Sequence, residues 1–167
     1  LARKLAVRLG VEPKEQQDIF FAALMHDVGK IGFPDNLLSR PVSKMNGEDL
    51  AHYRKHALAG ESARMPLDEL KDVSKLVRSH HERFDGQGFP DGLQGPGIPH
   101  GARILSVVND YDGLQIGTLA EKRMSAEEAK ALLLQSRGKR YDAQIVDAFI
   151  EMMGGQPQEV VSEKLVS

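Results

Sequence analysis

The stretch LVRSHHERFDGQGFP, residues 76–90, places two adjacent histidines where two very different sequence patterns meet. Apolar residues recur at helical spacing after Pro66, and continuing that face by one more turn reaches His80 and His81. Residues 85–101 are then crowded with glycine and proline, which helix interiors and central strands do not tolerate. The sequence therefore predicts a helix that carries both histidines towards the core and a long loop behind it.

The remainder of the chain repeats the helical pattern and offers no competing strand pattern. Gly10 and Pro13 separate the first two helices, and Ser125 with Glu128 forms a predicted capping box. Segment 31–46 has little periodicity and reads as a loop with a short helical turn. The predicted helices are 1–9, 13–26, 47–64, 66–81, 102–119, 126–137 and 143–153. The fold class is all-α, a bundle of about six to seven helices with a long Gly/Pro-rich loop.

Composition indicates one globular domain, residues 1–155, with a polar C-terminal tail at 156–167. A net charge of −2 argues against broad binding to DNA or RNA. No apolar run approaches the ~20 residues of a membrane span and no signal peptide is evident, so we expect a cytoplasmic protein. Because the chain begins at Leu1 inside an amphipathic pattern, we also expect an upstream helix and a sensory or regulatory domain in the parent protein.

The chain has no cysteine, so a transition metal must be held by imidazole and oxygen ligands. Four of the six histidines fall into a pattern: His26 beside Asp27, His56 alone, and the pair His80 and His81. Adjacent helical residues point about 100° apart, so the pair can bind two neighbouring ions, and a short carboxylate can bridge them. Each histidine alone is more often a helix cap or a satisfied core residue. Together they favour a multinuclear metal site.

HDVGK at 26–30 and HHERFDGQGFP at 80–90 resemble the two signatures of the HD-GYP family, with Phe89 in place of the tyrosine. The resemblance runs from Leu5 to about Gly154. It implies an HD-domain helical bundle that holds two or three divalent ions, iron or manganese. It also implies hydrolysis of cyclic di-GMP, to linear pGpG and to GMP, by a hydroxide that bridges the metals.

The resemblance also assigns roles to residues that match its motifs. Lys30 matches the lysine that contacts the scissile phosphate, and Asp27 would bridge the metals or accept a proton. Asp112 and Lys122 are the further substrate-binding candidates. The metal ligands it implies are His26, Asp27, His56, His80, His81 and Asn109.

Several positions depart from the family pattern. Asn109 stands where the family has its final metal-binding aspartate, and Asp110 follows it. We prefer Asn109, because a shift of one residue turns the side chain by about 100°. Thr118 to Glu121 replace an Arg-Pro-Tyr-Arg-like stretch that the family uses for nucleotide recognition. A further ligand histidine of the family would lie upstream of Leu1.

These departures keep two other hypotheses open: a receptor or protein-interaction module that signals through loop 85–101, and an HD phosphohydrolase that acts on another nucleotide. Glu82 is a candidate to orient a ligand histidine, and Asp85 to hold the loop, although structural roles are equally compatible. His52 and His100 belong to no motif and are predicted to lie on the surface.

Overall fold

The computed structural model describes residues 1–62 and 70–155, and within these ranges it contains eight α-helices and no strand beyond isolated bridges, which confirms the all-α prediction. The α-helices are α1 (Ala2–Arg8), α2 (Pro13–Met25), α3 (Asp35–Leu38), α4 (Gly47–Ser62), α5 (Lys71–Ser79), α6 (His100–Ile116), α7 (Ala126–Gln135) and α8 (Ala143–Met152). Three short 3-10 helices lie between them: η1 (Val28–Lys30), η2 (Val42–Lys44) and η4 (Gly95–Gly97).

Most predicted helix boundaries lie within a few residues of the observed ones. The four-residue α3 lies within segment 31–46, where the sequence predicts a loop with a short helical turn. Helix α6 ends at Ile116 and not at 119, because Gly117 takes a left-handed conformation with φ 88°. The capping box of Ser125 and Glu128 is present. The predicted helix end at Arg64, the predicted start at Pro66 and the tail 156–167 lie outside the described residues.

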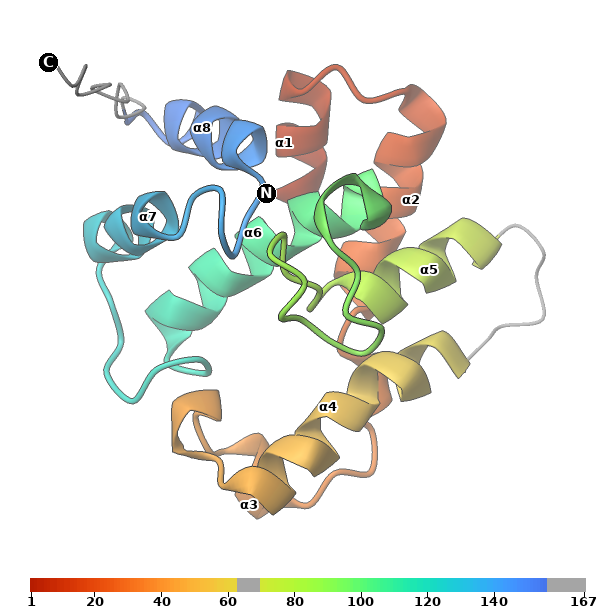
Figure 1. Ribbon diagram of the computed structural model, residues 1–167, viewed down its shortest axis with the longest axis vertical. Coiled ribbons are helices and arrows are strands. Elements are labelled where there is room, and N and C mark those ends of the chain that lie inside the picture. The colour runs from red at the N-terminus through yellow and green to blue at the C-terminus, as the bar shows by residue number, and fades with distance from the viewer. Residues whose placement is uncertain (63–69, 156–167) are drawn as a thin grey trace, which may run out of the picture.

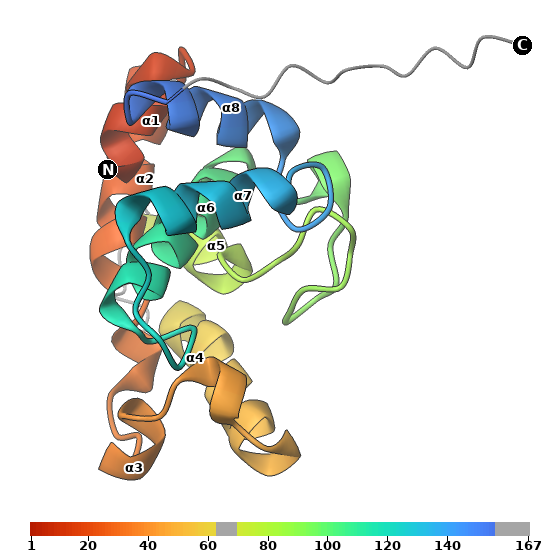
Figure 2. The same cartoon turned by 90° about the vertical axis from the view of Figure 1, so that its left-hand side faces the viewer.

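Helix α6 forms the centre of the bundle, with α1, α2 and α5 on one side and α7 and α8 on the other (Figure 1). Its buried positions include Ile104, Leu105 and Val108, which belong to one continuous apolar core. Helix α4 packs on η1 and α5 instead, and Figure 2 shows it below the main bundle. The histidines of α4 and α5 therefore meet at the junction of the bundle with this outlying helix. Within the described ranges, every helix is too short or too polar to serve as a membrane span.

A glycine allows η1 to approach α4 closely. A Cβ atom at Gly29 would overlap the carbonyl oxygen of His56 and lie 2.6 Å from the nitrogen of Gly60. Any side chain at position 29 would push the two backbones apart. The glycine of the HDVGK segment is thus needed to bring Asp27 and His56 together.

Candidate metal centre

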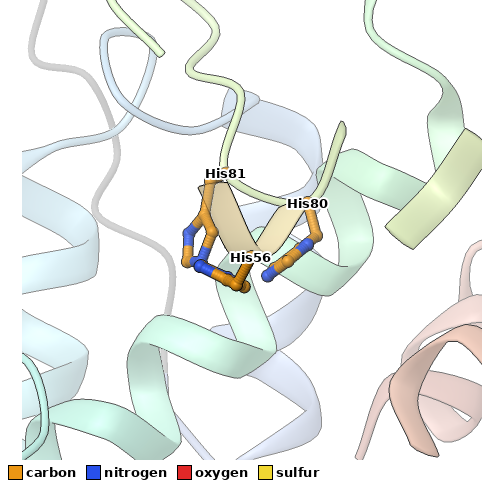
Figure 3. A group of neighbouring side chains, drawn as sticks. All are labelled: His56, His80 and His81. Carbon is orange, nitrogen blue, oxygen red and sulfur yellow. The ribbon is translucent and has the colours of Figure 1, made fainter. Parts of the chain in front are cut away.

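Three imidazoles, one from α4 and two from the C-terminal end of α5, meet at this junction. His56 lies on α4, His80 caps the C-terminus of α5, and His81 follows it. One ring nitrogen from each lies within 4.8 Å of the others, and Figure 3 shows the three side chains gathered around a common point. His56 and His80 are fully buried, which is uncommon for histidine. A fourth ring, that of His26, lies 5.3 Å from His80 between centroids.

The local backbone fixes the orientation of three of these rings. Nδ1 of His26, His56 and His80 each lies 2.5–2.9 Å from the carbonyl oxygen three residues earlier in the chain. A carbonyl can only accept, so each neutral ring carries its proton on Nδ1 and donates it there. The Nε2 atoms are left unprotonated, each with a free lone pair. Backbone hydrogen bonds of this kind commonly orient histidines that bind metals.

Within the described part of the chain, the Nε2 atoms have different surroundings. Nε2 of His80 is buried without any hydrogen-bond partner. Nε2 of His56 lies 3.0 Å from Nε2 of His81, so a nitrogen lone pair faces a second imidazole. A buried unsatisfied polar atom costs about 1–3 kcal/mol. The donor set therefore fits a divalent cation of the kind that prefers imidazole and carboxylate ligands.

Burial keeps these rings neutral. Desolvation lowers the pKa of His80 to about 3, and it lowers the pKa of His81 well below its ordinary value. The pKa of His56 is lowered as well, again chiefly by burial. A neutral imidazole is the form that binds a metal ion, so the cluster is ready to act as a ligand set at neutral pH.

Asp27 and Lys30 complete the polar side of the cluster. The two carboxylate oxygens of Asp27 face different histidines, with Oδ2 3.6 Å from Nε2 of His26 and Oδ1 3.9 Å from Nε2 of His56. Lys30 donates from Nζ to Oδ2 at 2.8 Å and lies 5.0 Å above the ring centroid of Tyr53. Burial raises the pKa of Asp27, but the nearby His26 and Lys30 lower it by more. The pKa of Asp27 therefore lies below its ordinary value, and the carboxylate is charged at neutral pH.

Glu82 shapes the Gly/Pro loop beside the cluster. Its carboxylate is buried and accepts hydrogen bonds of 2.7–3.1 Å from the backbone nitrogens of residues 91–93. The expectation that Glu82 orients a ligand histidine is therefore wrong, because the loop amides occupy both of its oxygens. A Cβ at Gly88 would lie 2.5 Å from the Glu82 Cα, so glycine is required there. The loop presents Phe89, whose ring stacks on His81 at 4.8 Å and 26°.

Asp85 holds the opposite arm of the same loop. Its carboxylate accepts from Arg83 at 3.0 and 2.6 Å and from the Gln87 backbone nitrogen at 3.1 Å. This arrangement agrees with the expected structural role.

The remaining candidate residues on and after α6 are dispersed. The Asp110 carboxylate is bound by Arg140 at 2.6 Å and by the Tyr141 hydroxyl at 2.7 Å, while Asn109 is half-buried beside it. Asp112 is exposed on α6. Partial burial of its carboxyl group raises its pKa above the ordinary value. Lys122 is exposed in the segment between α6 and α7, and among the described residues no recorded contact joins it to the histidines.

One residue has a place that sequence reasoning did not assign. Tyr53 is buried between Lys30 and the histidines, with its ring centroid 4.7 Å from that of His56. Its position one turn before His56 was an available signal. His52 is exposed as expected, and its ring contacts Phe33 at 4.8 Å. The side chain of His100 is 38% exposed.

Comparison with known proteins places this arrangement in a family. The profile described as an HD domain matches residues 1–145. A match over most of the chain shows that this protein belongs to the HD domain family. The resemblance to HD-GYP proteins is confirmed as well, because a solved HDG"Y"P protein from Bdellovibrio bacteriovorus superposes with a TM-score of 0.72. That structure is 28% identical, over 90% of this chain and 48% of the other.

Curated relatives carry the names of cyclic dinucleotide phosphodiesterases. A probable cyclic di-GMP phosphodiesterase of Vibrio cholerae is 38% identical over 90% of this chain and 36% of its own length. A 3'3'-cGAMP-specific phosphodiesterase of the same organism is 30% identical over 89% of this chain and 28% of its own length. The chain thus spans only about a third of the length of these relatives.

Proposed function

We propose that this chain is the catalytic domain of a metal-dependent phosphodiesterase that hydrolyses cyclic di-GMP to linear pGpG and GMP. The observation that carries the proposal is the set of buried imidazoles with free Nε2 lone pairs next to a charged carboxylate. The name of the probable cyclic di-GMP phosphodiesterase supports the choice of substrate, whereas the name of the 3'3'-cGAMP-specific relative supports only the wider class of cyclic dinucleotides.

The chain would hold two or three divalent ions, iron or manganese. The ligands we assign to them are His26, Asp27, His56, His80, His81 and Asn109. When bound, such ions act as Lewis acids and lower the pKa of a water molecule towards neutrality. Asn109 is preferred to Asp110 because Arg140 and Tyr141 already bind the Asp110 carboxylate.

The other residues of the centre would position the phosphodiester. Hydrolysis forms a bond between phosphorus and a water oxygen and breaks the bond to a ribose oxygen, which takes up a proton. Lys30 would neutralise charge that develops on the non-bridging oxygens, and its contacts with Asp27 and Tyr53 hold it at the site. Asp27 remains a carboxylate at neutral pH, which suits it to bridge ions or to accept the proton. Asp112 and Lys122 would contact the substrate more peripherally.

One experiment separates this proposal from its rivals. The purified chain is loaded with manganese or iron, its metal content is measured, and hydrolysis of cyclic di-GMP is compared with that of bis(4-nitrophenyl) phosphate. We expect turnover of both. Turnover of the aryl ester alone would indicate a phosphohydrolase for another substrate. Metal and cyclic di-GMP binding with no turnover of either would indicate a receptor.

The receptor hypothesis has specific support in this chain. Asn109 supplies one charge fewer than an aspartate, and Thr118 and Glu121 stand where the resemblance expects arginines. We retain it as the second candidate for that reason. The expected upstream regulatory domain, a protein partner bound by loop 85–101 and a cytoplasmic location also remain predictions.

A further inference from the structure

A partly open cavity adjoins the candidate metal centre. Lys30 and Tyr53 line it and also belong to the centre, so the cavity begins where the scissile phosphate would lie. It is partly open to solvent, so it suits one part of a larger ligand. The segment between η1 and α4 forms most of its wall.

The walls combine flat apolar surfaces with few polar groups. Phe33, Met45 and the buried ring of Tyr53 line the cavity, and Phe33 is braced by an edge contact with the His52 ring at 4.8 Å. Aromatic side chains are the common stacking surfaces for nucleobases. A purine whose phosphate lies at Lys30 would meet the aromatic rings of Phe33 and Tyr53 in this cavity.

Arg40 brings a second cation into the cavity. Its Nη1 pairs with the carboxylate of Asp49, which holds this end of the guanidinium at the cavity. Among the described residues this pair is its one recorded contact, so Nε and Nη2 can still donate to a ligand. Two parallel N–H donors match the O6 and N7 acceptors of guanine, whereas adenine presents an amino donor where guanine has O6.

The same cavity is lined by Thr118, the first residue of the stretch that lacks the expected arginines. The Thr118 carbonyl accepts a hydrogen bond of 2.9 Å from the Val42 nitrogen, so the two segments lie against each other. Arg40, which precedes η2, lines the same cavity as Thr118. It therefore provides a guanidinium at a place where the later stretch provides none.

We propose that this cavity binds a guanine base of the substrate and that Arg40 is the specificity-determining residue that recognises it. This inference rests on the proposed function, which supplies the cyclic dinucleotide.

The test compares Arg40→Lys with the unchanged protein on cyclic di-GMP and on cyclic di-AMP. Lysine keeps the charge and the contact with Asp49 but cannot make two parallel bonds, so the variant should fold. We expect its Kd for cyclic di-GMP, measured by calorimetry on metal-free protein, to rise roughly tenfold. The KM of the manganese-loaded protein should rise equally. The constants for cyclic di-AMP and kcat/KM for bis(4-nitrophenyl) phosphate should not change.

Two further variants control the test. Lys44→Gln removes a charge from the neighbouring turn without touching the cavity, and it should leave both nucleotides unaffected. Met45→Trp should fill the cavity and weaken both nucleotides while sparing the aryl ester.

Two outcomes would overturn the assignment. An unchanged Kd for cyclic di-GMP in Arg40→Lys would remove the proposed contact, and equal weakening of both nucleotides would mean that Arg40 reads phosphate. Failure of the proposed function looks different, because the unchanged protein would then hydrolyse no cyclic di-GMP whatever its Kd values.

Discussion

Two buried polar clusters lie close together in this protein, and they differ in how their hydrogen bonds are satisfied. In the C-terminal cluster, Asp110, Arg140 and Tyr141 satisfy one another at 2.6–3.0 Å. In the histidine cluster, Nε2 of His80 has no hydrogen-bond partner among residues 1–62 and 70–155, and Nε2 of His56 lies 3.0 Å from Nε2 of His81. A self-satisfied cluster is sufficient for structure. A cluster of unsatisfied acceptors costs stability unless a ligand completes it.

The two clusters therefore predict opposite responses to mutation. Loss of a histidine should remove function and leave the fold largely intact. Loss of a residue of the C-terminal cluster should instead destabilise the fold and leave the metal in place. Four predictions follow from this contrast, beginning with the largest effect.

His56→Ala should reduce manganese-dependent hydrolysis of cyclic di-GMP by more than about 100-fold, since even residues that merely support metal ligands commonly cost 10–100-fold. Bound metal, measured by mass spectrometry, should fall in parallel. Lys55→Ala is the control, because it removes an exposed side chain from the same helix. Equal losses in both variants would contradict the assignment.

Arg140→Met should lower the free energy of unfolding by about 2–3 kcal/mol, because it leaves the Asp110 carboxylate buried with one hydroxyl donor. The expected loss lies below that of a fully buried pair, since the Arg140 side chain is 36% exposed. Urea denaturation measures it, with exposed Lys139→Met as the control. Metal content should stay unchanged.

The double variant Asp110→Leu with Arg140→Met should recover most of that stability, because no buried charge remains. If the single variant instead lost its metal at unchanged stability, the two clusters would not be independent.

The metal-free protein should lose stability as the pH falls below about 6.5. Burial lowers the folded-state pKa of His80 to about 3, so between these values only the unfolded chain takes up the proton. Stability is fully present above the unfolded pKa and falls by up to ~1.4 kcal/mol per pH unit for each such histidine. Melting temperatures between pH 8 and pH 5 measure the effect. His80→Gln should weaken the pH dependence, and an identical profile in that variant would refute the cause.

Asn109→Asp should raise manganese affinity about tenfold, equivalent to ~1.4 kcal/mol, by returning a charged ligand to the centre. Titration with manganese measures the affinity. Asn36→Asp adds the same charge at an exposed position in α3 and should have no effect. A larger gain from Asn36→Asp than from Asn109→Asp would exclude position 109 as a ligand.

The sequence by itself determined the helical class, most helix boundaries and the set of candidate ligands. Helical periodicity and the glycines and prolines that interrupt it are local properties, and Ser125 caps its helix through its own neighbours. The two signature motifs pointed to the family by their residues alone, although the glycine of the first motif serves a tertiary contact, the close approach of η1 to α4 at Gly29.

Tertiary structure alone decided how distant residues satisfy one another. Glu82 binds the loop amides and not a histidine, Asp110 is engaged by Arg140, and Arg40 shares a cavity with Thr118. None of these pairings leaves a periodic trace, because each joins side chains whose separation in sequence is set by the packing of helices. The sequence names the groups that can donate and accept, but only the packed chain determines which of them remain free for a ligand.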